Sequence, residues 1–375
     1  MFYIYAGNEL LYEPGNSRLF VFSPKLTLEM GKAGSLEFSV PSVNPLYSNL
    51  QQMKTGVSVF MDDEELFHGR VLSNKRNFNN TRDIYTEGTL AYLVDSVQKA
   101  EKYNGKARQL FRNIIAAHNR MVADPAKQFT VGTITVDDRD VYIVGQSDAD
   151  GDIYEDLETK SFNYKQIAIN SIADEWQNTF DYIESCLTDY CGGYLRTRTV
   201  NGVNYIDWLK DYYTTGTQTI SVGRNMLDLT EEVSIEDAFT VLIPLGDENI
   251  TIETAPVYNA DGLSHAAGSV EIVDTAAVAK YGRIVKTNVF DGVNTVETLF
   301  ENAKRYIKSN INIPTTLTVT AVDLHLIDSD IRAIHLGDKM RIQSDYHEID
   351  DEYICTKIEY DLGNPANTIY TFGNP

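Results

Sequence analysis

The chain has 375 residues, of which 43% are hydrophobic and 23% are charged. It is long enough for two or three domains and apolar enough to bury their cores. The formal net charge of −22 argues against a nucleic-acid-binding protein, which needs clustered Lys and Arg. No stretch approaches the roughly 20 apolar residues of a membrane-spanning helix. The N-terminus lacks the basic region and small-residue cleavage site of a signal peptide.

The negative charge is unevenly placed along the chain. Residues 1–145 hold 16 Lys and Arg against 16 Asp and Glu, so the whole net charge comes from residues 146–375. The default interpretation of such an acidic region is solubility. A sharper one is a channel wall that lets DNA pass without sticking. A neutral N-terminal region beside an acidic remainder also fits a chain with one end docked onto another protein.

Residues 26–97 carry the clearest pattern of the chain. Apolar and polar residues alternate in three short runs, and the acidic turn Asp62–Glu65 precedes a fourth run in which Gly69 permits a bulge or a close backbone approach. Apolar residues then recur at helical spacing after Gly88. Together with strand-like pieces before residue 23, this order predicts a first antiparallel β-barrel domain at residues 1–97, closed by a helix.

An inserted α+β domain is predicted at residues 98–235. An apolar stripe between residues 107 and 122 predicts an amphipathic helix, and His118 on that stripe is interpreted as a core or interface histidine because no second ligand lies at a helpful spacing. Two strands are expected in residues 129–144. Asn178 is predicted to be the N-cap of a helix that ends at Gly192 and Gly193. Further on, Asn201-Gly202 predicts a β-hairpin.

Two long segments are predicted to be mobile loops. The first, residues 146–160, contains Asp148, Asp150 and Asp152 at alternate positions, as in a calcium loop. Its glycine falls between the second and third aspartates rather than after the third, so a solvated acidic turn is the default interpretation. The second loop, residues 254–268, contains an unaccompanied His265 to which we assign no chemistry.

The C-terminal part predicts a second β-barrel that is interrupted once. Its first part is expected at residues 236–295 and its closing strands at residues 331–375. Between them, residues 296–330 predict a helix–strand insertion, with an apolar helical stripe followed by the strand 317–321. The predicted fold class is therefore α+β and mainly β, with two related small antiparallel barrels and inserted α+β domains.

No catalytic apparatus is visible in the sequence. There is no nucleophile elbow, zinc-protease helix motif or phosphate-binding loop, and the six histidines are spread singly. Cys186, Cys191 and Cys355 lack metal-ligand spacing and are interpreted as buried thiols. We therefore predict no catalytic, cofactor-binding or metal-binding residues, no cofactor, and a protein that is not an enzyme.

Several stretches in fixed order resemble one family. In the first predicted barrel they are "GSLEF", "NPLY", "GRV" and "EGTLAYLVD", and further on "GGYLRTRTVNGVNYIDWLKDY" and "LIPLG". The combination is similar to phage tail-tip hub proteins, the tail-associated proteins of siphophages and prophages of Gram-positive hosts. These proteins are in turn similar to the baseplate hubs of contractile phages. The resemblance covers roughly residues 20–375, and in that family "LIPLG" opens the second barrel.

The resemblance implies a structural virion protein at the tail tip, assembled in the host cytoplasm. It implies a homotrimer whose two barrels per chain supply six similar units for the ring of the distal tail protein. Such a hub caps the tail tube and gates release of tape-measure protein and DNA at infection, with receptor-binding proteins as further partners. Many members carry peptidoglycan-cutting domains after the second barrel, and this chain stops at "TFGNP", so a short non-enzymatic form is expected. The alternatives are an adhesin for host-surface carbohydrate and a cell-wall endopeptidase.

Overall fold

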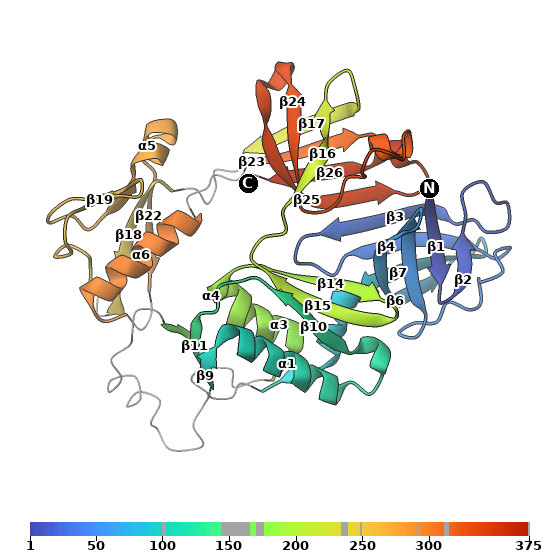
Figure 1. The fold of residues 1–375 in the computed structure, drawn as a ribbon, viewed down its shortest axis with the longest axis horizontal. Helices are drawn as coiled ribbons and strands as arrows, with labels where there is room; N and C mark the ends of the chain where they lie inside the picture. The colour runs from blue at the N-terminus through green and yellow to red at the C-terminus, as the bar shows by residue number, and fades with distance from the viewer. Residues whose placement is uncertain are drawn as a thin grey trace. The chain divides into compact units, whose positions relative to one another are not determined.

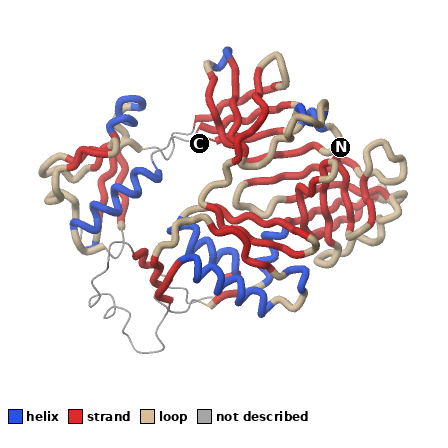
Figure 2. The backbone as a smooth tube through the Cα atoms, viewed as in Figure 1, coloured by secondary structure: helices blue, strands red, loops and turns tan. Residues whose placement is uncertain are grey.

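A computed structural model describes residues 1–99, 103–143, 166–169, 176–233, 239–247, 250–290, 293–310 and 315–373. The chain forms two compact units, a main unit of residues 1–230 with 317–373 and a second unit of residues 231–316. Figure 1 follows the chain by colour, and Figure 2 distinguishes its strands (red) from its helices (blue). The predicted α+β, mainly β class is confirmed.

One thirteen-stranded sheet dominates the main unit. Its main order is β17-β23-β26-β25-β3-β4-β7-β6-β5-β1-β2, with β24 paired to β25 and β16 paired to β24. The strands of the N-terminal half are β1 (Phe2–Ala6), β2 (Glu9–Tyr12), β3 (Phe22–Glu29), β4 (Ser35–Pro41), β5 (Gly56–Met61), β6 (Glu64–Arg76) and β7 (Thr81–Gly88). Those of the C-terminal half are β16 (Thr214–Ser221), β17 (Met226–Val233), β23 (Thr315–Ala321), β24 (Asp338–Ser344), β25 (Ile349–Asp361) and β26 (Ile369–Gly373).

The two halves of the sheet are joined by strand pairing. β25 runs antiparallel to β3, with Ile358 opposite Leu28 and Tyr360 opposite Leu26. The alternating apolar residues that predicted the strands point inward from both halves into one continuous hydrophobic cluster. Each large side chain fully buried there contributes about 1.5–3 kcal/mol. The halves therefore form one packed body.

Two glycines allow neighbouring backbones in the N-terminal half to touch. A Cβ atom at Gly69 would lie 2.1 Å from the carbonyl oxygen of Glu87, which confirms the predicted close approach. A Cβ atom at Gly88 would lie 1.8 Å from the carbonyl oxygen of Ala33. Gly88 also ends β7, and the predicted helix after it is a 3-10 helix, η1 (Thr89–Asp95).

The inserted region packs helices against small sheets. The helix α1 covers the predicted stripe, and His118 is buried in the core, as predicted. Phe111 of α1 packs on Trp208 with ring centroids 5.4 Å apart. The helical elements are α1 (Ala107–Met121), η2 (Pro125–Lys127), α3 (Thr179–Ile183), η3 (Glu184–Thr188) and α4 (Asp189–Cys191). The strands are β8 (Val97–Gln98), β9 (Tyr103–Lys106), β10 (Phe129–Ile134), β11 (Asp140–Ile143), β12 (Gln166–Ile169), β13 (Gln177–Asn178), β14 (Tyr194–Val200) and β15 (Val203–Leu209).

The local signals in this region predicted the structure well. The Asn178 side chain accepts a hydrogen bond from the Asp181 N–H at the start of α3. Gly192 ends α4 with a φ of 71°. Asn201 and Gly202 both have positive φ between β14 and β15, as a two-residue hairpin turn requires.

In its described residues, the second unit is a five-stranded sheet with two α-helices. Its strand order is β19-β20-β21-β18-β22, and its core includes Phe239, Leu242 and Phe300. The predicted helical stripe is confirmed as α6. The elements are β18 (Val241–Leu245), β19 (Tyr258–Ala260), β20 (Leu263–His265), β21 (Ile272–Asp274), α5 (Thr275–Tyr281), β22 (Val285–Val289) and α6 (Val296–Asn310).

Three expectations about this part of the chain were wrong. The "LIPLG" strand β18 lies in the second unit and not in a barrel of the main sheet. Residues 254–268 are not one long loop, because β19 and β20 form a hairpin around Asp261-Gly262, and Leu263 and His265 are buried. β16 and most of β17, expected in the inserted domain, belong to the main sheet. The reason is long-range: β16 pairs in parallel with β24, and no local pattern encodes that pairing. The predicted loop 146–160, with Asp148, Asp150 and Asp152, lies outside the described residues.

Candidate functional site

A cleft of about 1090 Å³ opens within the main unit. One wall is the acidic turn between β5 and β6, and another is β14 of the inserted region. A third is the connection between β23 and β24, which contains the short 3-10 helix η5 (Leu324–Leu326). The lining is strongly charged: it includes Asp62, Asp63, Glu64, Glu65, His68, Arg196, Arg198, His325, Arg332 and His335.

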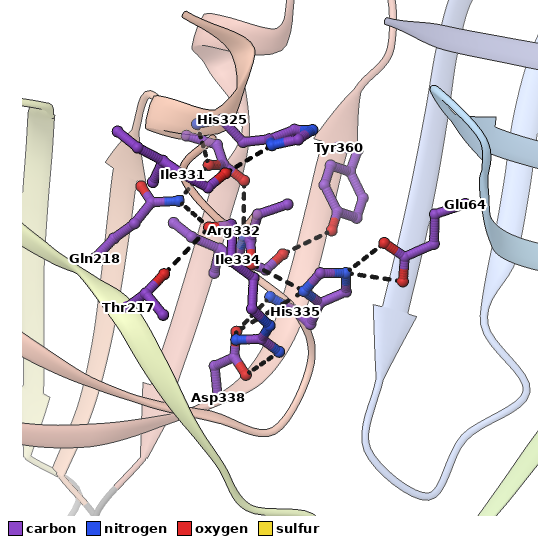
Figure 3. A network of polar contacts seen from close by, with 12 residues as sticks. Glu64, Thr217, Gln218, His325, Ile331, Arg332, Ile334, His335, Asp338 and Tyr360 are labelled. Atoms are coloured by element: carbon purple, nitrogen blue, oxygen red, sulfur yellow. Dashed lines mark hydrogen bonds and ion pairs between the residues drawn. The ribbon is translucent and has the colours of Figure 1, made fainter. Parts of the chain in front are cut away.

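The acidic turn contacts the β23–β24 connection through two histidines. Nε2 of His335 lies 3.0 Å from each carboxylate oxygen of Glu64, as Figure 3 shows. Nε2 of His325 lies 3.2 Å from Oδ2 of Asp62. The other carboxylate oxygen of Asp62 accepts a hydrogen bond from the amino group of Met1. That bond, with the contact from His325, lowers the pKa of Asp62.

Backbone carbonyls hold the opposite side of each imidazole ring. Nδ1 of His325 lies 2.7 Å from the carbonyl oxygen of Ile331. Nδ1 of His335 lies 2.9 Å from the carbonyl oxygen of Ala333. Because a carbonyl oxygen only accepts hydrogen bonds, each Nδ1 must donate. The rings are therefore fixed with Nε2 toward the acidic turn.

Two buried aspartates shape the connection that carries these histidines. Asp323 accepts hydrogen bonds from the side chain of Gln218 at 2.6 Å and from the backbone N–H groups of His325 and Ile334. Asp338 forms a bidentate ion pair with Arg332, at 2.9 and 3.0 Å (Figure 3). These buried carboxylates have charge-assisted partners, as burial requires. The connection is thus preorganised within the C-terminal half.

A third buried carboxylate positions the arginines on the β14 wall. Asp207 of β15 is fully buried, and its carboxylate accepts hydrogen bonds from Arg196, Arg198 and the Thr133 N–H. Burial alone would raise the pKa of Asp207, but these donors lower it. The side chains of Arg196 and Arg198 are about 40% exposed, so both remain accessible to solvent.

One serine–histidine cluster is buried. Ser96 Oγ lies 2.6 Å from Nδ1 of His118, whose Nε2 donates to the Lys127 carbonyl oxygen at 3.0 Å. Thr179 bonds to the same serine, and all three of these side chains are enclosed. A substrate carbonyl cannot reach this serine, so the cluster serves as a satisfied polar core.

The cysteines are thiols with little exposure. Cys186 and Cys355 are buried, as predicted, whereas Cys191 is half-buried. Burial raises the pKa of Cys191 and Cys355, and a thiol in that state is a weak nucleophile. Over the described part of the chain, no three His, Cys, Asp or Glu side chains are arranged to hold a metal ion. Within the same residues, no helix has the length and apolarity to cross a membrane.

Sequence reasoning missed the contact between the acidic turn and the histidines. It interpreted Asp62 and Asp63 as a solvated turn and the six histidines as unrelated. The structure brings His325 and His335 to that turn, although 263 and 271 residues separate the partners. No local signal could have found this pairing, because it depends on how β25 joins the two halves.

Comparison with solved structures gives the class of protein to which this fold belongs. The 43 kDa tail protein of prophage MuSo2 from Shewanella oneidensis matches with a TM-score of 0.62 at 12% identity, over 99% of this chain and 97% of that chain. The tail protein from Neisseria meningitidis MC58 matches with a TM-score of 0.59 at 12% identity, over 100% and 96%. Prophage tail protein gp18 from Listeria monocytogenes EGD-e matches with a TM-score of 0.56 at 15% identity, over 100% and 94%. The fold is that of prophage tail proteins.

A family model narrows this assignment for the C-terminal part. Residues 214–375 match the model of the family described as "Prophage endopeptidase tail", so this part of the chain is similar to that family. No curated protein sequence matches the chain. The resemblance to phage tail proteins, predicted from the sequence, is thereby confirmed. The matched segment includes the second unit and all strands of the C-terminal half of the main sheet.

Proposed function

We propose that this chain is the structural hub of a phage tail tip, a homotrimer that caps the tail tube and gates the release of tape-measure protein and DNA. One observation carries the proposal: the fold matches prophage tail proteins over at least 94% of both chains in each comparison. The likeness thus covers both units and the inserted region. A role that belongs to the whole architecture fits this better than one confined to a single site.

The joined sheet supports a mechanical role. The N-terminal and C-terminal halves share strand pairing through β3 and β25 and a single hydrophobic cluster. Each chain thus presents its two halves in a fixed relation, as a subunit must when three copies supply six similar units to a six-fold ring. The net charge of −22 suits a wall past which DNA travels without being held.

The N-terminal half, which lies within the neutral stretch of residues 1–145, is the proposed docking surface for the distal tail protein. Its surface exposes large apolar side chains singly, among them Val43, Met53 and Phe78, of which Phe78 is completely exposed. Interfaces use such apolar and aromatic side chains as anchors. The receptor-binding proteins and the tape-measure protein are further proposed partners.

The proposed role is not enzymatic. The Ser96–His118 pair is enclosed. In the cleft, Nδ1 of His68 contacts both Ser58 and Glu65, and His325 and His335 contact Asp62 and Glu64. The family name includes an endopeptidase, and that observation favours one competing function, cleavage of cell-wall peptides. Incubating the purified chain with purified cell walls and following release of new amino groups tests it directly. If the chain releases more amino groups than a heat-inactivated sample, the structural proposal is wrong and the chain is an endopeptidase.

The trimer is tested by native mass spectrometry and light scattering. We expect a species of three times 42.2 kDa, either alone or after addition of the distal tail protein of the same phage. Electron microscopy of virions carrying a tagged copy should then show three tags at the tail tip. A stable monomer at high concentration, even with the distal tail protein present, would refute the hub proposal.

A further inference from the structure

We propose that His325 and His335 form a proton-dependent latch that fastens the β23–β24 connection to the acidic β5–β6 turn. The latch has two contacts, His325 with Asp62 and His335 with Glu64, at 3.2 and 3.0 Å. The connection belongs to the C-terminal half of the main sheet and the turn to the N-terminal half. The two contacts therefore bridge the halves across the cleft.

The argument rests on counting donors and acceptors around each ring. Nδ1 of both histidines faces a backbone carbonyl oxygen, and Nε2 of both faces a carboxylate. Carbonyl and ionised carboxylate oxygens accept hydrogen bonds and cannot donate. A neutral imidazole carries a single N–H, so it can satisfy only one of its two neighbours. Each contact is complete only when a proton also lies between Nε2 and the carboxylate.

Most of the other charged groups near the rings have partners of their own. Beside His325, the Asp323 carboxylate has three donors of its own, and the Met1 amino group bonds to Asp62. Beside His335, Asp338 is paired with Arg332, and the hydroxyl of Tyr360 bonds to the Ile334 carbonyl oxygen. The other titratable groups of the turn that line the cleft are Asp63, Glu65 and His68, and His68 Nδ1 lies 3.2 Å from Glu65. Asp62 and Glu64 are the carboxylates that contact the two Nε2 atoms.

Exposure makes the latch responsive to the solvent. The histidine side chains are 18% and 22% exposed, so water competes weakly for them, while the two carboxylates are about half exposed. Histidine is the side chain that ordinarily changes charge between pH 5 and 8. Loss of one proton per ring leaves the Nε2 lone pair against a carboxylate, and each contact then becomes repulsive.

The structure also indicates what would be released. The connection keeps its internal anchors, Asp323 and Asp338, in either state, because their partners are backbone N–H groups, an amide and an arginine. Raising the pH would therefore free the connection from the acidic turn without unfolding it. Any consequence for opening of the tail rests on the proposed function. The latch itself is a property of the single chain.

Hydrogen–deuterium exchange of the isolated chain tests the latch. Exchange of residues 322–337 is compared at pH 5.5 and pH 8, after correction for the intrinsic rate with an unstructured peptide. We expect protection of this segment to fall about fivefold at pH 8, the scale of partly exposed charge pairs. Protection of β25, in the core of the same half, should stay constant. Equal protection of residues 322–337 at both pH values would refute the latch.

Amide substitutions separate the latch from a general pH effect. In the double variant D62N/E64Q, each carboxylate becomes an amide that can donate to a neutral Nε2 or accept from a protonated one. We expect the segment to remain protected and its pH response to disappear. The matched control is H347Q. It removes a ring that bonds to Ser344 between β24 and β25, and we expect it to leave the pH response unchanged. A full pH response in D62N/E64Q would assign it to other groups and overturn the proposal.

Failure of the latch and failure of the hub proposal give different results. The exchange experiment uses the single chain and does not depend on trimer formation. Mass spectrometry of the assembly does not depend on pH-dependent exchange of residues 322–337. A trimer without a pH response would remove only the latch, and a responsive monomer would remove only the hub.

Discussion

Arg70 forms a bidentate ion pair with Asp95, and its guanidinium also donates to Glu87 at 2.7 Å. The Arg70 side chain is only 6% exposed. This pairing joins strand β6 to the 3-10 helix η1, and Lys127 adds a second cation at 2.7 Å from Asp95. The inserted region is therefore fastened to the N-terminal half of the main sheet by buried charge.

Removing one partner of this pair should destabilise the fold. We expect Asp95→Asn to lower the free energy of unfolding by about 3 kcal/mol, because the buried Arg70 guanidinium then keeps only Glu87 as a charged partner and Lys127 also loses its carboxylate. Urea denaturation at pH 7 measures this. The matched control is Asp137→Asn. Asp137 pairs with Lys210, and both side chains are 61% exposed, so this substitution should change the free energy of unfolding by less than about 0.5 kcal/mol. Equal effects of the two substitutions would show that burial does not decide the outcome.

A methyl group at Gly88 should be tolerated far worse than one at Gly56. A Cβ atom at Gly88 would lie 1.8 Å from the Ala33 carbonyl oxygen, whereas at Gly56 the nearest atom is 3.8 Å away. We expect Gly88→Ala to cost about 2 kcal/mol or more, since backbone must move to admit it. Gly56→Ala should stay within about 0.5 kcal/mol of the parent. Thermal melting of the two variants measures this difference. Comparable melting temperatures would contradict the close backbone contact at Gly88.

His118 should make the fold less stable in acid. Burial lowers the pKa of His118. The hydrogen bond to the Lys127 carbonyl oxygen and the nearby charge of Asp95 offset this lowering only in part. The unfolded chain therefore takes up this proton more readily than the folded one. The contribution of neutral His118 is fully present above about pH 6.5 and is lost as the pH falls below that value.

The measurement for His118 is a pH series of urea denaturations. The stability difference between the parent and His118→Gln should shrink as the pH falls from 7.5 to 5, by at most about 1.4 kcal/mol per pH unit. The difference between the parent and His347→Gln serves as the reference. A His118 difference that stays constant over this range would contradict the buried neutral ring. The sign is opposite to that of the latch, so the two histidine effects can be told apart.

The cysteines should resist modification in the folded chain. Cys186 and Cys355 are buried, and burial raises the pKa of Cys355 and of the half-buried Cys191. We expect a disulfide reagent such as Ellman's reagent to label Cys191 slowly at pH 8 and the other two only after denaturation. Mass spectrometry identifies the labelled site. Rapid labelling of Cys355 without denaturant would contradict its burial.

Individual strands, helices and turns could be predicted from the sequence where a few neighbouring residues determine them. Alternation located the strands of the N-terminal half, the cap Asn178 located α3, and Asn201-Gly202 located a hairpin. Each signal depends on neighbouring residues that adopt their conformation for steric or hydrogen-bonding reasons. The turn at Asp261-Gly262 carried the same hairpin signal, but the short strands around it were interpreted as a loop.

The assignment of strands to sheets could not be predicted in the same way. β18 has the apolar composition of a barrel strand, yet it pairs with β21 and β22 in the second unit. β16 pairs with β24 across most of the C-terminal half of the chain. Such choices depend on loop closure and on which faces can be buried together. The candidate latch was invisible for the same reason, since its partners meet only after β3 and β25 have paired.

The pairing of β3 with β25 has a consequence for synthesis. Strand β3 leaves the ribosome long before its partner residues 357–361, which lie more than 300 residues further along the chain. Until then the nascent N-terminal half displays an open strand edge beside an incomplete hydrophobic cluster. Neighbouring chains on one polysome could pair through these edges, so shielding by a chaperone or slow initiation would favour soluble protein. The yield of this protein should therefore depend on how it is translated as well as on how stable it is.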